Sequence, residues 1–362
     1  MGNSEKVAGI GLMSGTSLDG LDMAYCEFYV SEDRYDFKIA CAETINYSDD
    51  WKNELTFDPN VSAYDLKKLD LKFGSWIGLQ VNEFINTHQL KPSFIASHGH
   101  TWFHEPENRI NLQIGDGYEI YRLTRIPVIN DFRSLDIRMG GQGAPLVPIG
   151  DELLFPAYDC CVNLGGFANI SGKAGGKRIS FDVMPFNLLL NFCSRKLGLA
   201  FDAGGEMASS GKLISALKSD LEKLKYFSDS PPKSLGVEWL HREVFPILES
   251  YKGEKIADLL YTYTLFSAEQ LLQSFDVFDR YRTVLLTGGG AYNQYFVEQL
   301  KLMSGDRTKI ILPDPGVIDF KEAMVFAFLG LLRLDNKINC LNQVTGASKS
   351  VSGGIIYDQF IS

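Results

Sequence analysis

The sequence predicts an α/β protein of two lobes. Short apolar runs typical of strands alternate with longer amphipathic stretches typical of helices, which is the order of elements that an α/β fold requires. The order of strand, glycine turn, strand and then helices begins near residue 7 and again at residue 160. A chain of 362 residues is long enough for two lobes that each bury a core of their own.

The first third of the chain begins with a hairpin. Residues 7–13 fit a strand, residues 14–20 a tight turn and residues 21–28 a returning strand. The elements expected after it are a strand over 37–45, a helix over 63–88, a strand over 94–96, a loop from 97 to 101, a helix over 117–125 and a strand over 127–129.

The second part repeats this outline after a stretch rich in glycine and proline at 140–148. Residues 160–164 fit a strand, 165–169 a glycine turn and 179–183 a further strand, and residues 283–286 fit a strand that leads into a third glycine turn. Helices are expected near 205–224, 238–249, 256–275, 293–303 and 319–334.

Charge and composition exclude several classes of protein. A formal net charge of −10 opposes broad affinity for nucleic acid or for an anionic membrane surface. The longest strongly apolar run, 323–332, is about half of what a membrane span requires. The N-terminus lacks the pattern of a signal peptide, and the six cysteines show no CxxC spacing, so we expect buried thiols in a reducing cytoplasm.

The turn of the first hairpin has the composition of a phosphate-binding loop. Gly15 and Gly20 permit backbone conformations that aim successive N–H groups at one anion, and Thr16 and Ser17 add hydroxyl donors. Asp19 and Asp22 are placed poorly for direct contact with phosphate, but they suit a water-bound Mg²⁺ or a sugar hydroxyl. A polar β-turn without a ligand is the alternative.

Three glycine turns at strand ends favour nucleotide binding. They lie at 15–20, 165–169 and 288–293. A Walker phosphate loop is excluded, because the sequence around Lys212 has Glu206 and Leu213 where glycine and a hydroxyl residue are required. The dinucleotide pattern GxGxxG and the hydrolase pattern GxSxG are also absent at the positions that could carry them.

Other polar residues leave more than one interpretation open. His98, His100 and His104 have a spacing compatible with metal binding, but Gly99 and Pro106 favour a loop that forms hydrogen bonds instead. Asp182 ends a predicted strand and would serve either as a general base or as a cap of the next turn. Arg133 lies in a segment of alternating charge, where it would bind a substrate carboxylate or pair with its neighbours.

The chain resembles the anhydro-N-acetylmuramic acid kinase family, which belongs to the superfamily of sugar kinases, Hsp70 and actin. The motifs that carry the resemblance are residues 11–22 (GLMSGTSLDGLD), 97–99 with His104, 131–133, 140–148 (GGQGAPLVP), 163–166, 288–291 and 344–347. They extend over nearly the whole chain, and the first of them is specific. The resemblance therefore covers both predicted lobes.

The resemblance implies a two-lobed actin-like ATPase fold with a cleft between the lobes. Lobe I would comprise 1–128 and 345–362, and lobe II 129–344. It also implies an enzyme that uses ATP and Mg²⁺ to open 1,6-anhydro-N-acetylmuramic acid with water and to phosphorylate its 6-oxygen. The product would be N-acetylmuramic acid 6-phosphate, made in the cytoplasm during cell-wall recycling. Members of the family are usually homodimers, so the resemblance also implies a homodimer.

The resemblance assigns roles to particular residues. Asp182 would be the catalytic base, with Glu322 as a second catalytic residue. The sugar would contact Ser14, His98, Arg133 and Asp182. The nucleotide would contact Gly15, Thr16, Ser17, Leu18, Asp19, Gly20, Leu21, Asp22, Gly165, Gly166, Asn169, Gly288, Gly289 and Gly290, with Mg²⁺ held by the nucleotide and through water by Asp19 or Asp22.

The sequence departs from the family's pattern directly after the predicted base. Thr-Gly-Pro-Gly-Asn is usual there, and this chain has Val183, Met184, Pro185, Phe186 and Asn187. Bulky residues in place of glycine would narrow the space for a ligand or change the turn. Gln is usual at His100, and the motif at 231–237 (PPKSLGV) lacks a usual Thr and Arg. A kinase of another sugar, or a non-catalytic sugar-binding or nucleotide-binding member, is therefore the alternative.

Overall fold

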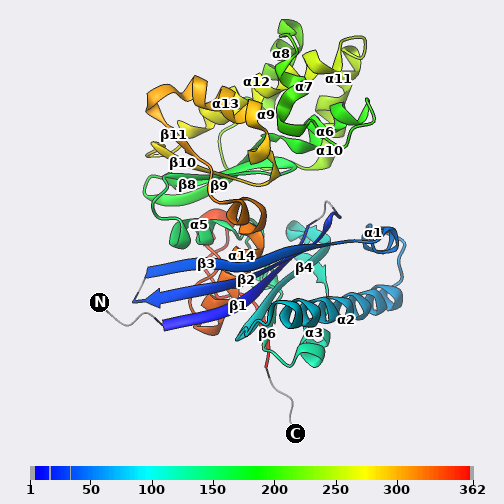
Figure 1. Ribbon diagram of the computed structural model, residues 1–362, viewed down its shortest axis with the longest axis vertical. Helices are drawn as coiled ribbons and strands as arrows, with labels where there is room; N and C mark the ends of the chain where they lie inside the picture. The colour runs from blue at the N-terminus through cyan, green and yellow to red at the C-terminus, as the bar shows by residue number, and fades with distance from the viewer. Residues whose placement is uncertain (1–4, 16–17, 33, 359–362) are drawn as a thin grey trace. The chain divides into compact units, whose positions relative to one another are not determined.

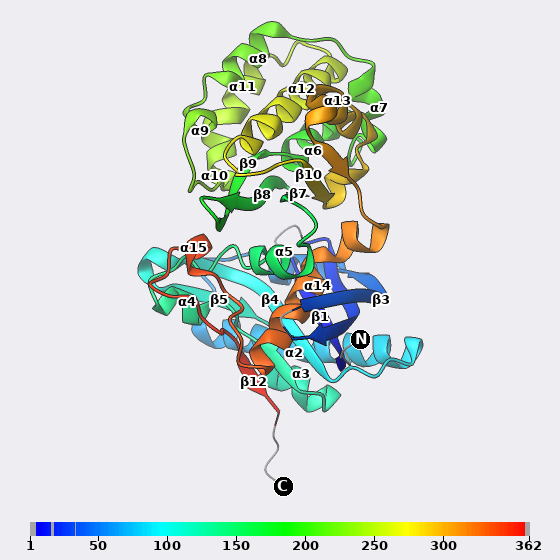
Figure 2. The same cartoon turned by 90° about the vertical axis from the view of Figure 1, so that its left-hand side faces the viewer.

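The structure, a computed structural model, describes residues 5–15, 18–32 and 34–358. The chain divides into two compact units: unit 1 comprises Met1–Phe155 and Phe320–Ser362, and unit 2 comprises Pro156–Asp319. Each unit contains one β-sheet with helices packed on it (Figures 1 and 2). The predicted α/β class is confirmed.

Unit 1 is built on a seven-stranded sheet of order β12-β6-β4-β1-β2-β3, with β5 paired to β4. Its strands are β1 (Glu5–Ser14), β2 (Gly20–Ser31), β3 (Arg34–Asn46), β4 (Phe94–Glu105), β5 (Ile110–Ile114), β6 (Val128–Asn130) and β12 (Ile355–Tyr357). Its helices are α1 (Asp49–Leu55), α2 (Ala63–His88), α3 (Gly117–Thr124), α4 (Ser134–Arg138), α5 (Pro148–Leu154), α14 (Pro315–Leu334, which begins in unit 2) and α15 (Asn342–Thr345).

Alternation along β1 separates two layers of helices in unit 1. Ile10 and Leu12 point into a core shared with Phe73 and Ile77 of α2. Gly11 points to the opposite face, where a side chain would meet the backbone oxygen of Ala323 in α14. Helices α2 and α14 therefore cover opposite faces of the sheet (Figure 1).

Unit 2 is built on a five-stranded sheet of order β11-β10-β7-β8-β9, with α6, α12 and α13 gathered on one side of it (Figure 2). Its strands are β7 (Cys160–Leu164), β8 (Phe167–Ala174), β9 (Lys177–Pro185), β10 (Thr283–Thr287) and β11 (Lys309–Ile311). Its helices are α6 (Asn187–Arg195), α7 (Glu206–Ser209), α8 (Ser215–Glu222), α9 (Lys225–Ser228), α10 (Val237–Trp239), α11 (Phe245–Ser250), α12 (Ile256–Phe275) and α13 (Gln294–Ser304).

The division into units differs from the predicted lobe boundaries at 128/129 and 344/345. Strand β6 pairs with β4 and β12, so the chain beyond residue 128 continues in unit 1. Helix α14 bends at Phe320, and from that residue on it packs on the sheet of unit 1. Two crossings at 155/156 and 319/320 therefore join the units.

Three local predictions are wrong. The expected loop at 97–101 is part of β4, which continues to Glu105 and pairs with β5. The expected glycine turn at 165–169 is limited to Gly165 and Gly166, because β8 begins at Phe167. Asp182 does not end its strand, since β9 continues to Pro185.

The expected helix over 205–224 is interrupted, because Gly211 packs directly on α12. A side chain at Gly211 would lie within 2.1 Å of the Ala257 carbonyl oxygen. The helix expected over 238–249 is divided by a wider helical turn, Leu240–Val244, that precedes Pro246. These interruptions come from tertiary packing and from proline, which amphipathic periodicity does not report.

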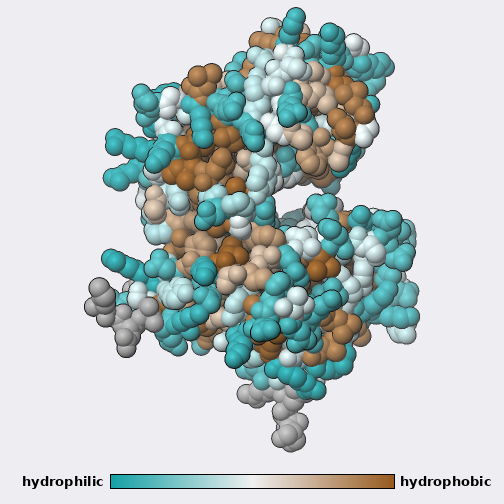
Figure 3. Space-filling view, viewed as in Figure 1, coloured by the Kyte–Doolittle hydropathy of each residue, from teal (hydrophilic) through white to brown (hydrophobic). Residues whose placement is uncertain are grey.

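No helix within the described residues is long and apolar enough to span a bilayer. On the face shown in Figure 3, apolar patches interrupt a mainly hydrophilic surface. All six cysteines are free thiols, and five of them are buried.

Candidate active site

The carboxyl end of β1 carries a buried hydrogen-bonded chain in unit 1. Ser14 pairs in parallel register with His100 of β4, and the Ser14 Oγ lies 2.9 Å from His100 Nδ1. The Tyr47 hydroxyl donates to the same Oγ at 2.7 Å. Burial lowers the pKa of His100, so its ring is neutral near pH 7. The predicted substrate residue Ser14 is therefore fixed by two side-chain partners.

Beside this chain, the buried His98 pairs with the half-buried Arg133. The Arg133 Nη2 lies 2.8 Å from His98 Nε2, and Arg133 Nη1 donates to the Gly143 carbonyl oxygen at 2.7 Å. His98 Nδ1 lies 2.9 Å from the Gly99 carbonyl oxygen. Burial and the guanidinium charge hold the pKa of His98 well below its usual value. The neutral ring therefore donates from Nδ1 and accepts at Nε2.

Arg133 stays cationic although it is half-buried. Burial lowers the pKa of its guanidinium to about 10, and the Glu322 carboxylate on α14 acts in the opposite direction. The backbone of Ser14 also acts on the His98 ring and partly opposes the fall in its pKa. Ser14, His98, Arg133 and Glu322 therefore all belong to unit 1, whereas the predicted lobe boundaries put Arg133 and Glu322 in the other lobe.

The turn between β1 and β2 is described only in part. Thr16 and Ser17, which the sequence predicts to bind nucleotide, lie outside the described residues. Leu18 has a positive φ of 58°, and its N–H bonds to the Gly15 carbonyl oxygen at 3.3 Å. A non-glycine residue in this conformation is characteristic of a constrained turn.

The residues after this turn have mixed roles. Asp19 is exposed, and the Asp22 Oδ1 accepts a hydrogen bond from Thr44 Oγ1 at 2.6 Å. Leu21 is fully buried in the core, so its side chain has a structural role. Gly20 approaches the Ile45 carbonyl oxygen too closely for a side chain. Nucleotide binding by this turn stays a prediction.

In unit 2 the two other glycine turns lie at the same edge of the sheet. Gly165 follows β7, Gly288 follows β10, and the two strands are parallel neighbours. Gly288 has a φ of +81°, and a Cβ there would come within 2.2 Å of Asn163 Oδ1. A Cβ on Gly289 would meet no atom closer than 4.0 Å. Open backbone at the end of parallel strands suits close approach of a phosphate.

A row of polar residues crosses the sheet just before this edge. Register places Thr287 beside Asn163, Asn163 beside Asn169 and Asn169 beside Asp182. The predicted nucleotide residue Asn169 and the predicted base therefore lie side by side. Sequence reasoning did not assign a role to Asn163, although an amide in the otherwise apolar run of β7 is a signal for it.

Asp182 has one anchored and one open carboxylate oxygen. The Leu235 N–H donates to Oδ2 at 2.8 Å, and in the described chain Oδ1 has no hydrogen-bond partner. A register shift between β8 and β9 falls at this point, as β-bulges near functional sites often do. Burial raises the pKa of Asp182, and the Leu235 N–H opposes that shift. An oxygen of raised basicity is thus free to accept a proton.

The bulky residues after Asp182 belong to the core of unit 2. Met184 and Phe186 are both fully buried, and the Phe186 ring packs edge-on against Phe296 with centroids 4.6 Å apart. The Tyr263 hydroxyl donates to the Pro185 carbonyl oxygen. Asn187 begins α6 and donates to the Leu164 carbonyl oxygen at 3.0 Å. Both side chains point into the core of unit 2 and not into the ligand space, so the other predicted effect, a change of the turn, is the one that stays a prediction.

The histidine cluster does not have the arrangement of a metal site. His98 and His100 use their rings in the hydrogen bonds above, and His104 is exposed and lies 3.1 Å from Asn111 Oδ1. Across the described residues, no group of three or more histidine, cysteine or carboxylate side chains could hold a metal ion. The three histidines therefore act as hydrogen-bonding residues, although they lie on a strand and not in a loop.

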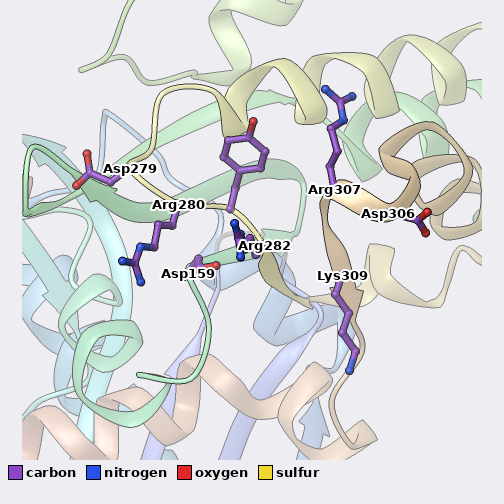
Figure 4. A pocket seen from close by; sticks show the side chains of 8 residues that line it. Asp159, Asp279, Arg280, Arg282, Asp306, Arg307 and Lys309 are labelled. Carbon is purple, nitrogen blue, oxygen red and sulfur yellow. The ribbon is translucent and has the colours of Figure 1, made fainter.

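A hollow of about 850 Å³ lies at the opposite edge of the unit 2 sheet, where β7, β10 and β11 begin. Its lining includes the cations Arg280, Arg282, Arg307 and Lys309 and the carboxylates Asp159, Asp279 and Asp306. Figure 4 shows that Arg307 and Lys309 point in opposite directions. The charges nearly balance and the cations do not converge, so this hollow lacks the features of a built anion site.

Comparison with known proteins identifies the family. The model of the anhydro-N-acetylmuramic acid kinase family matches residues 7–359. The anhydro-N-acetylmuramic acid kinases of Francisella tularensis subsp. novicida and Clostridioides difficile are each 33% identical to this chain, and each match covers 96% of this chain and 97% of the relative.

A solved structure, component A of the (R)-2-hydroxyglutaryl-CoA dehydratase of Acidaminococcus fermentans, matches with a TM-score of 0.45 and 11% identity, over 89% of this chain and 96% of that one. A likeness of this degree adds nothing to the assignment, which depends on the family match and the relatives. By these, the chain belongs to the anhydro-N-acetylmuramic acid kinase family.

Proposed function

We propose that this protein is an ATP-dependent kinase that opens 1,6-anhydro-N-acetylmuramic acid and phosphorylates its 6-oxygen in cell-wall recycling. Family membership supports the kinase class and its substrates. The single structural observation that carries the proposal is Asp182, because one oxygen of its carboxylate is anchored and the other is open. A purely binding protein has no use for such a base.

In the proposed reaction Asp182 accepts a proton from a water molecule. The water oxygen forms a bond to the anomeric carbon while the bond from that carbon to the bridging 6-oxygen breaks. The 6-oxygen attacks the γ-phosphorus, and the bond from this phosphorus to the ADP oxygen breaks. Burial of Asp182 raises its pKa and so strengthens it as a base, provided that it is ionised at the working pH.

The residues of unit 1 are proposed to bind the sugar. Arg133 is cationic, half-buried and held in a fixed orientation by His98 and Gly143, so its guanidinium suits the carboxylate of a muramic acid. Ser14 offers a hydroxyl whose rotation is restricted by His100 and Tyr47. Glu322 lies close enough to Arg133 to influence its charge and is proposed to help orient the bound sugar.

The glycine turns are proposed to bind ATP together with Mg²⁺. Gly165, Gly166, Gly288 and Gly289 present backbone at one edge of the unit 2 sheet, whereas Gly290 is buried against Phe186 and Leu164. Asp19 and Asp22 are the carboxylates proposed to reach Mg²⁺ through water, in keeping with the preference of that ion for phosphate and water ligands. Bound Mg²⁺ would neutralise charge on the transferred phosphate.

The site of action is proposed to be the cytoplasm, where ATP is available and free thiols such as these six persist. A homodimer is proposed from the resemblance alone. Light scattering of the purified chain would measure its mass directly.

The experiment that tests the function measures ADP release with ATP, Mg²⁺ and 1,6-anhydro-N-acetylmuramic acid. We expect turnover by the unaltered protein and a fall of about 10³-fold in Asp182→Asn, which removes the base but keeps an acceptor for the Leu235 N–H. Turnover with a different sugar only would indicate a divergent kinase. Binding of the sugar without any turnover would indicate a non-catalytic member, and unchanged turnover in Asp182→Asn would exclude this base.

A further inference from the structure

The motif at 231–237 has no part in the proposed chemistry, yet it lies directly against Asp182. Its backbone runs beside β9, and the Asp182 N–H donates to the Lys233 carbonyl oxygen at 3.2 Å. Two residues later the Leu235 N–H donates to Asp182 Oδ2 at 2.8 Å. One short segment therefore bonds both to the backbone and to the carboxylate of the proposed base.

Tyr226, which precedes this motif, adds a third hydrogen bond to Asp182. The Tyr226 hydroxyl donates to the Asp182 carbonyl oxygen at 2.6 Å. The Lys233 Nζ donates to the Tyr226 carbonyl oxygen at 2.9 Å and lies 4.6 Å from the centre of the Tyr226 ring. We call residues 226–235 the strap. Lys233 joins the two ends of the strap and makes no bond to the Asp182 carboxylate.

These contacts have different consequences for Asp182. The bonds from Tyr226 and to Lys233 involve only the backbone of Asp182, and they fix where its Cα lies. The bond from Leu235 fixes the carboxylate itself and favours the ionised form, because a donor stabilises negative charge. Since only Oδ2 is engaged, the same bond selects Oδ1 as the oxygen that meets water.

We propose that the strap is the positioning element of the base, and that the Leu235 N–H both orients the Asp182 carboxylate and keeps it ionised. This inference rests on the proposed role of Asp182. It gives the motif at 231–237 a function that depends on backbone groups, so the replacement of the usual Thr by Leu235 leaves that function intact. Tyr226, Lys233 and Leu235 are assigned as positioning residues, because their contacts are with Asp182 or within the strap.

The test compares Leu235→Pro, which lacks the N–H, with Leu235→Ala, which keeps it. We expect Leu235→Pro to lower kcat about tenfold near neutral pH and to move the acid limb of the kcat profile to higher pH by roughly 1 unit, with KM for sugar and ATP unchanged. Leu235→Ala is expected to keep the limb in place. A limb that stays in place in Leu235→Pro, at normal thermal stability, would overturn the proposal.

Two further variants test the strap proposal if Leu235→Pro does not fold. Tyr226→Phe removes one bond to the Asp182 backbone, and we expect a several-fold fall in kcat with unchanged KM. An unchanged kcat there would count against positioning by the strap. Asp182→Asn separates the two proposals: if it retains turnover, the proposed base is wrong, whereas if it is inactive while the strap variants behave as the unaltered protein, only the strap proposal fails.

Discussion

Asp136 of unit 1 and Asp182 of unit 2 are both shielded from solvent, but they differ in how many hydrogen bonds their carboxylate oxygens accept. Asp136 is fully buried, and its Oδ1 accepts from Thr345 Oγ1 at 2.8 Å and from Cys340 Sγ at 3.2 Å. Its Oδ2 accepts from the Gly143 N–H at 2.8 Å. Asp182 has a single donor, from Leu235.

The difference separates a structural carboxylate from one available for chemistry. Both oxygens of Asp136 accept hydrogen bonds from the protein and the side chain is fully buried, so this carboxylate stabilises a loop and is not accessible to a ligand. Asp182 bears the cost of burial with only partial compensation, which is a common property of catalytic groups. Asp136 nevertheless affects the site indirectly, because Gly143 bonds to it through the N–H and to Arg133 through the carbonyl oxygen.

The largest expected effect on stability is that of Asp136→Asn. An amide has one oxygen, so either Gly143 or the pair of Thr345 and Cys340 would face an NH₂ group in a buried space. We expect a loss of about 3 kcal/mol in the free energy of unfolding, measured with urea. We also expect a higher KM for the sugar, because the loop that holds Arg133 loses its anchor.

The control for this variant is Cys340→Ala, which removes only a weak donor to Asp136 and is expected to cost less than about 1.5 kcal/mol. If Asp136→Asn kept full stability while turnover disappeared, Asp136 would be a chemical group and the contrast with Asp182 would be false.

A second, smaller effect is expected from Arg133→Lys. The guanidinium bonds to His98 and Gly143 from different nitrogens, a geometry that a single ammonium does not reproduce. We expect KM for the sugar to rise about tenfold while KM for ATP changes little, measured by steady-state kinetics. Equal increases in both constants would show that Arg133 stabilises the fold of unit 1 and does not bind the sugar. Arg138→Lys, on the exposed end of α4, is the matched control.

Much of the fold follows from the sequence, and the exceptions have physical causes. Helices α2 and α12 have the predicted bounds, because their periodic apolar positions extend without interruption to a clear end. The strand β4 was underestimated, since Gly99 and the histidines suggest a loop while pairing with β5 extends the sheet. Local composition does not report pairing between distant segments.

The site shows the same limit. Glycine turns and Asp182 stand out in the sequence because glycine clusters and a carboxylate interrupt or follow apolar, strand-like runs. The position of the Phe186 side chain cannot be predicted in this way. A bulky residue after a proposed base suggests a blocked ligand site, but the Phe186 ring packs against Phe296 in the core. The bond from Leu235 to Asp182 joins residues 53 positions apart through a backbone group, so no side-chain pattern reveals it.

The smallest effect concerns the stability cost of the base itself. Burial raises the pKa of Asp182 in the folded protein above the ordinary value of about 3.8. Below that ordinary value the carboxyl is protonated in both states, and the cost is absent. As the pH rises through the ordinary and then the raised pKa, ionisation favours the unfolded chain, so the cost grows to a constant. Asn does not ionise and avoids this cost.

We therefore expect Asp182→Asn to be more stable than the unaltered protein at pH 7, by on the order of 1 kcal/mol, and equally stable near pH 3. Urea unfolding at both pH values measures this difference. Asp136→Asn is the control, since its lost hydrogen bonds predict the opposite sign at pH 7. If both variants lost stability, the hydrogen bonds of Asp182 in the folded protein would compensate its burial as fully as those of Asp136 do. Its open oxygen would then have no measurable effect on the free energy of unfolding.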